Sequence, residues 1–262
     1  MARHREKVRM SSIIPRKLAK KLVLLAVKFL PFKWRDVLSR YWVQTRLLFS
    51  RTILILVVAM FAFFTWATIE QHTFREQEAF YFLMVQSIGL GILLHMGLWE
   101  KERDGRTFEL LIMRIPRLHE LIWFKLRVSL FWVFFLSLPF FIGYTWFISI
   151  PVWRMLVYLL FCMTVSLFAV FLTSVVSSFV HSSLATGIIA VILMWVMAGF
   201  LFNARIPRIK YFQIFLMPFN ERYGTFENFW LLFLNRLILL FIILALYGWF
   251  YERLKKTEKW IL

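Results

Sequence analysis

The sequence predicts an all-α membrane protein that crosses the bilayer with six helices. Of the 262 residues, 61% are hydrophobic and only 18% are charged, more apolar surface than one soluble core of this length can bury. The apolar residues also gather into six runs of roughly 20 residues, the length that crosses a hydrocarbon layer about 30 Å thick. The expected spans are residues 52–68, 80–99, 128–148, 155–180, 185–202 and 229–250.

Residues 1–51, ahead of the first span, form a basic arm with an amphipathic segment. Apolar residues recur in it at helical spacing, while arginine and aspartate occupy the other faces. We expect this segment to be a helix that lies along the membrane interface. Its apolar stripe consists of Trp34, Val37, Leu38, Tyr41, Trp42, Thr45 and Leu48.

The connections between the spans differ in length and character. Residues 69–79 are expected to form a tight exposed loop, and Pro139 is expected to kink the third span. Residues 203–228 mix short apolar patches with charges, which predicts re-entrant or interfacial helices before the last span. Residues 251–262 form a basic tail.

The distribution of basic residues predicts the orientation. Twenty-five of the 32 Lys and Arg residues fall in 1–51, 100–127 and 251–262, and only six fall in the loops on the other side. By the positive-inside rule both termini and the loop 100–127 face the cytoplasm, and 203–228 is extracytoplasmic. The net charge of +18 is therefore assigned to topology and anionic lipid rather than to nucleic acid. The expected location is the cell membrane, most simply a bacterial inner membrane.

The chain has no recognisable catalytic, nucleotide-binding or metal-binding motif. HExxH, GxxxxGK[ST], GxGxxG and CxxC are all missing from the sequence, and no two histidines have the i, i+4 spacing of a metal site. Cys162, the only cysteine, lies in an apolar run and is expected to be a packing residue. We therefore expect no enzyme activity, metal or cofactor in this chain, and any ATP would bind to another chain.

Polar residues inside the spans have two possible roles. They could line a translocation path, or they could form hydrogen bonds between packed helices, and the sequence does not separate these readings. Arg236 lies near one boundary of its span and is expected to snorkel toward the interface. The candidate path residues are Gln86, Ser87, Thr173 and Ser177.

The loop 100–127 carries the most informative pattern. Acidic residues precede Gly105, and an apolar patch then runs to Pro116. Thr107 is a plausible helix N-cap, so that Leu110, Leu111 and Met113 form a short docking face. Such a helix, held outside the membrane at the end of a span, could receive force from a motor protein or could simply lie on lipid.

This loop resembles the signature of ABC-2 type transporter permeases, in which acidic residues end the second span and a Gly-Thr-x-Glu-x-Leu-Leu stretch, a proline and a lysine follow. Arg106 departs from the pattern because it separates Gly105 from Thr107. The six spans, the N-terminal interfacial helix and the segment before the last span also match the family's architecture. The matching positions are Glu100, Glu102, Gly105, Thr107, Glu109, Leu110, Leu111, Pro116 and Lys125.

The resemblance implies a transmembrane permease subunit of an ATP-driven exporter. Two copies would pair as a dimer around a central path, and each would dock a separate cytoplasmic ABC ATPase that binds ATP and Mg. The substrate would be a lipid, a polysaccharide, a drug or a similar molecule moving outward. The residues implied in coupling to the ATPase are Glu100, Glu102, Gly105, Arg106, Thr107, Phe108, Glu109, Leu110, Leu111, Met113 and Pro116.

Two other functions remain open from the sequence. A membrane coupling subunit of an ABC-type uptake system would also be basic and helical, but it predicts two long cytoplasmic coupling helices where one is visible here. An intramembrane enzyme would need paired acids or histidines within the bilayer, and the spans contain almost none.

Overall fold

A computed structural model describes residues 41, 45, 48–49, 51–70, 75–96, 118–180, 182–202, 213, 216–219 and 229–261. The chain divides into two compact units, Met1–Arg46 and Leu47–Leu262. In the first unit Tyr41 and Thr45 are helical, and the rest of the expected amphipathic helix lies outside the described residues. So do residues 97–117 and most of the segment 203–228.

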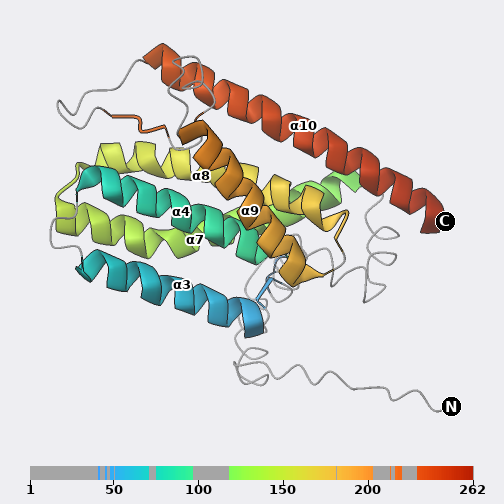
Figure 1. The fold of residues 1–262 in the computed structure, drawn as a ribbon, viewed down its shortest axis with the longest axis horizontal. Helices are drawn as coiled ribbons and strands as arrows, with labels where there is room; N and C mark the ends of the chain where they lie inside the picture. The colour runs from blue at the N-terminus through green and yellow to red at the C-terminus, as the bar shows by residue number, and fades with distance from the viewer. Residues whose placement is uncertain are drawn as a thin grey trace, which may run out of the picture. The chain divides into compact units, whose positions relative to one another are not determined.

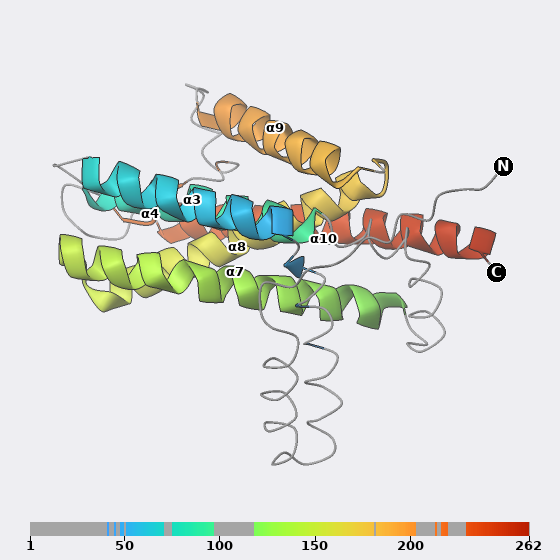
Figure 2. The same cartoon turned by 90° about the horizontal axis from the view of Figure 1, so that it is seen from below.

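The described part of the second unit is built from six helices (Figure 1). Successive helices run in opposite directions, so the unit has one end where α4 begins and another where it ends, named here the Glu76 end and the His95 end. Figure 2 shows the same helices from below, with α9 and α7 on opposite sides of α4 and α8. The helices are α3 (Arg51–Glu70), α4 (Glu76–His95), α7 (Leu118–Ile148), α8 (Val152–Ser177), α9 (Ser183–Phe202) and α10 (Phe229–Ile261).

Five of these helices, all except α9, are long and apolar enough to cross a membrane. The prediction of an all-helical chain is therefore confirmed for the described residues, and five of their helices have the length and composition of membrane spans. The fifth expected span, residues 185–202, corresponds to α9, whose apolar part with described side chains, Ser183–Met197, is shorter than the other five helices.

The helices extend beyond the apolar runs that predicted them. α4 begins at Glu76 rather than at residue 80, and α7 begins at Leu118 rather than at residue 128. Backbone hydrogen bonds continue a helix regardless of side-chain polarity, and acidic residues in a first turn favour the positive end of the helix dipole. At α4, the backbone N–H of Arg75 donates to the Glu78 carboxylate over 2.9 Å. Residues 118–127, expected in a loop, are thus the first turns of α7.

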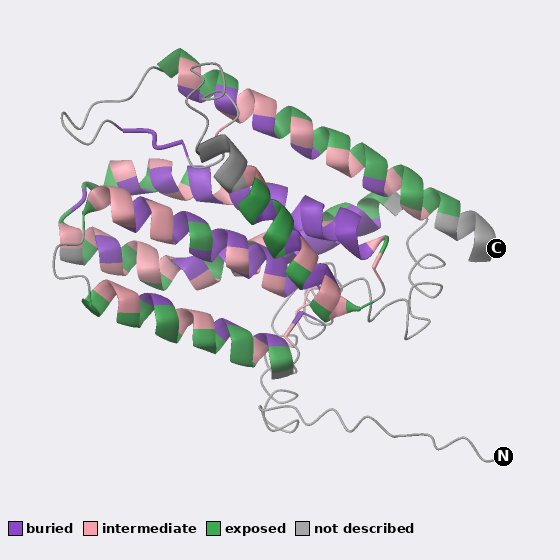
Figure 3. Ribbon diagram, in the orientation of Figure 1, coloured by how far each residue is buried: buried purple, intermediate pink, exposed green. Residues whose placement is uncertain are grey.

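Burial divides the helices into an inner and an outer pair. About two thirds of the α4 span and three fifths of the α8 span are buried, against 17% for α3 and 22% for α10. Figure 3 shows this contrast as mostly purple ribbon for α8 and mostly green and pink ribbon for α3 and α10. The exposed faces carry large apolar side chains such as Trp66, Trp195 and Phe241, which suit contact with lipid.

Two backbone features shape the path of α7. The helix continues through Pro139, where the sequence predicted a kink. At its end, Ser149 has a φ of 55°, a left-handed conformation that residues other than glycine adopt rarely. This residue lies in the short turn before Pro151, which precedes the first residue of α8.

Candidate functional site

Polar side chains enter the interior of the helix bundle at three levels along α8. At the Glu76 end, α8 contributes Arg154 and Tyr158. In its middle it contributes Cys162 and Thr164, and near the His95 end it contributes Ser174. Because polar groups are costly within a membrane unless they are paired, each level identifies a place where the helices are specifically joined.

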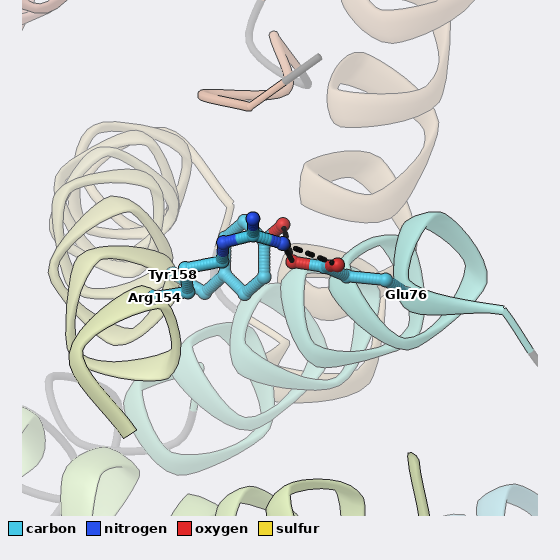
Figure 4. A network of polar contacts seen from close by, with 3 residues as sticks. All are labelled: Glu76, Arg154 and Tyr158. Carbon is cyan, nitrogen blue, oxygen red and sulfur yellow. Dashed lines mark hydrogen bonds and ion pairs between the residues drawn. The ribbon is translucent and has the colours of Figure 1, made fainter. Parts of the chain in front are cut away.

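The first level is an ion pair with an added hydroxyl, drawn in Figure 4. The Arg154 guanidinium donates to the Glu76 carboxylate over 3.0 Å, and the Tyr158 hydroxyl donates to the same carboxylate over 2.6 Å. Arg154 also lies 5.4 Å from the centre of the Phe219 ring. The network joins the first turns of α4 and α8, with Phe219 packed against it. It remains partly exposed, with 19% of the Arg154 side chain and 25% of the Glu76 side chain accessible.

The second level contains Arg236 of α10. Its guanidinium donates to the Thr164 hydroxyl over 3.0 Å and lies 3.9 Å from the centre of the Phe161 ring. Thr164 lies about 18 Å from the start of α8 at 1.5 Å per residue, so Arg236 reaches toward the middle of the bundle. The expectation that this arginine snorkels toward the interface is therefore wrong. A cation over an aromatic ring is a favourable arrangement where water is excluded.

The third level, at the His95 end, joins three helices through one imidazole. His95 is 2% exposed; its Nδ1 lies 3.1 Å from the Ser129 hydroxyl of α7, and its Nε2 lies 2.6 Å from the Ser174 hydroxyl of α8. Lys125 of α7, one turn from Ser129, is completely buried. We name His95, Ser129 and Ser174 the His95 junction.

The sequence did not predict the His95 junction. Sequence spacing links only residues of one helix, whereas the junction unites positions 95, 129 and 174, which meet only after the helices pack. The sequence did contain one usable signal, which is that three polar residues lie near the same end of three neighbouring spans. Glu76 and Tyr158 were missed for the same reason, since Glu76 was expected in a loop.

The candidate path residues are separated by the structure into two groups. Thr173 donates to the carbonyl of Ala169 and Ser177 to that of Ser174, each over 2.7 Å. The Ser87 side chain forms a hydrogen bond with Cys162 of α8. All three therefore have partners, but only Ser87 bonds to another helix; Thr173 and Ser177 bond to the backbone of their own helix, α8. Gln86 differs: its side chain is completely buried, and neither its Oε1 nor its Nε2 has a hydrogen-bond partner among the described residues.

The predicted coupling residues cannot be placed in this arrangement. All of them, from Glu100 to Pro116, lie outside the described residues. Lys125, the last position of the resemblance, is described and lies buried beside the His95 junction.

No metal site emerges from the described residues, which contain no group of three or more His, Cys, Asp or Glu placed to hold an ion. Cys162 is buried, as its apolar surroundings in the sequence predicted. No known protein family, curated protein or solved structure matches the chain.

Proposed function

We propose that this chain is the transmembrane permease subunit of an ATP-driven ABC exporter. In this proposal the chain spans the cell membrane six times, has both termini in the cytoplasm and pairs with a second copy. The loop segment 100–116 docks a separate ATPase, which supplies ATP hydrolysis, and a lipid, polysaccharide, drug or similar substrate moves outward.

The observation that carries the proposal is the position of the His95 junction. The segment 97–117 leaves α4 directly after Met96 and enters α7 at Leu118. His95 is the last residue of α4, and its imidazole contacts both α7 and α8. A force applied to the segment would therefore act next to a junction of three helices, as energy coupling from outside the membrane requires.

The charge pattern and the sequence resemblance support the same direction of coupling. The positive-inside bias assigns the His95 end to the cytoplasm, where an ATPase would bind. The resemblance assigns the docking face to Thr107, Leu110, Leu111 and Met113. A chain without a nucleotide-binding motif needs such a partner to use ATP.

The test is purification of the tagged chain from its native membrane in mild detergent. A stoichiometric ABC ATPase with vanadate-sensitive ATP hydrolysis is the expected result. Leu110→Glu or Leu111→Glu should release the ATPase while the chain stays in the membrane, because a charge disrupts an apolar docking face. Lys256→Glu, a charge reversal at the exposed end of α10, is the control and should retain the ATPase. A stable complex without any ATPase would refute the proposal.

A further inference from the structure

Gln86 is a buried polar residue of the bundle whose side chain the packing of the described helices leaves unexplained. Its amide is completely buried in α4, with no hydrogen-bond partner among the described residues. A primary amide has two donors and an acceptor, and leaving all of them unmatched in apolar surroundings is costly. A residue that is costly in this arrangement of helices needs another arrangement in which its amide is used.

The position of Gln86 indicates where that arrangement forms. Phe82, Gln86 and Gly89 lie on one stripe of α4, at helical spacing of four and three residues. The Phe82 ring lies 5.6 Å from that of Phe64 in α3, and a Cβ on Gly89 would lie 3.1 Å from the Met60 sulfur, also in α3. Gln86 therefore lies on the side of α4 that faces α3.

The same stripe borders α7. Phe64 of α3 contacts both Phe82 of α4 and, at 6.5 Å between ring centres, Phe140 of α7. Gln86 follows Phe82 by one turn toward the His95 end, so it lies along the seam where these three helices meet. Neighbouring Ser87 points to the opposite partner, since it bonds with Cys162 of α8.

The α3 side of the seam is also lightly buried, although the hydroxyls of Thr68 and Tyr144, 3.2 Å apart, join α3 to α7. The α3 span is 17% buried, the lowest value of the five apolar spans, and its contacts with α4 are made by flexible or aromatic side chains. A small displacement of α3 would uncover Gln86 without breaking the His95 junction or the network of Glu76, Arg154 and Tyr158, named here the Glu76 network. Neither of them involves α3.

We propose that Gln86 lines a translocation path that opens between α3, α4 and α7, and that its amide hydrogen-bonds the neutral hydroxyl groups of a passing substrate. A neutral amide that both donates and accepts suits hydroxyls, as in a sugar or a polyol, and does not neutralise a charged group. The inference rests on the proposed transport function and specifies both the location of the path and the chemistry of its cargo.

The first test uses thiol labelling in native membrane vesicles. Gln86→Cys in a Cys162→Ala background is exposed to the water-soluble, charged reagent methanethiosulfonate ethylsulfonate, with and without ATP. Met84→Cys in the same background is the matched control, because Met84 is equally buried and shares the stripe of Gly91, whose Cβ would contact α8. During ATP turnover the thiol of the Gln86→Cys variant should react at least tenfold faster than the thiol of the control. Equal rates in every condition would overturn the proposal.

A second arm tests the chemistry of the cargo. Dodecyl maltoside below its micelle concentration presents sugar hydroxyls on an amphiphile, and it should slow the labelling of the Gln86→Cys variant severalfold. Dodecyltrimethylammonium, which has the same alkyl chain and no hydroxyl, should not. Labelling that maltoside leaves unchanged would assign the hydroxyls to water and overturn the claim about the substrate.

A stability measurement guards against a variant that misfolds. Gln86→Met keeps the volume of the side chain and removes the amide, so it should raise the melting temperature while slowing export. Ser87→Ala is the control and should lower the melting temperature, since it removes a bond to α8. A fall in the melting temperature for Gln86→Met would mean that the amide is already bonded at rest and would refute the proposal. Purification of the ATPase tests the exporter function separately, so the two failures are distinguishable.

Discussion

The two faces of α4 are held by different kinds of contact. Toward α8, it is joined by the Glu76 network at one end, by Ser87 with Cys162 in the middle and by His95 with Ser174 at the other end. Toward α3, it meets the Phe64 ring and the flexible Met60 side chain. The comparison leads us to expect that α4 and α8 move together and that α3 shifts more readily.

The largest expected effect is at the His95 junction. His95→Ala should lower the free energy of unfolding by about 2–3 kcal/mol, because it leaves a cavity and removes bonds to two helices. Thermal unfolding in detergent measures the change. His119→Ala, at an exposed position on α7, is the control and should be neutral. Equal effects of the two variants would contradict the junction's role.

Two glycines of α4 test the contrast between its faces directly. A Cβ at Gly91 would lie 3.3 Å from the backbone carbonyl oxygen of Ser166 in α8, which cannot easily move. Gly91→Ala should therefore destabilise by about 1–2 kcal/mol. Gly89→Ala meets only the end of the Met60 side chain and should stay within about 0.5 kcal/mol of wild type. A larger effect at Gly89 would reverse the comparison.

The Glu76 network should contribute little to the free energy of unfolding, although it joins three side chains. Its side chains are partly exposed, so Glu76→Ala should cost only about 1 kcal/mol. Glu76→Gln keeps an oxygen that can accept from Tyr158 and should cost about half as much. Chemical denaturation of the two variants measures the difference. A Gln variant as unstable as the Ala variant would make the charge, rather than the hydroxyl bond, the main contribution.

A small effect is also expected at α3. Thr68 of α3 and Tyr144 of α7 have their hydroxyls 3.2 Å apart. Thr68→Val should destabilise by about 0.6 kcal/mol, the usual value for such a bond within a membrane. Thr145→Val, which removes a bond only within α7, provides the reference. A loss above about 2 kcal/mol, far outside the range for one such bond, would mean that α3 is firmly anchored and would weaken the proposed path.

Hydropathy predicted the helices but not their ends or their partners. The apolar runs placed every described helix, because burial in lipid depends on local composition. The first turns of α4 and α7 were missed, since Glu76 and Lys125 are polar residues that become acceptable only through tertiary contacts. Whether Gln86 and Ser87 were path or packing residues could not be decided, because adjacent residues of a helix face different neighbours.

The length of α10 has a consequence for the surrounding lipid. Its 33 residues extend about 50 Å, whereas a hydrocarbon layer is about 30 Å thick. The helix must therefore tilt or extend beyond the hydrocarbon layer. Near its end it carries Arg253, Lys255 and Lys256, basic residues that bind favourably to lipid phosphate groups. Because a change in bilayer thickness alters the tilt of such a helix, the contact of Arg236 with α8 would respond to membrane composition.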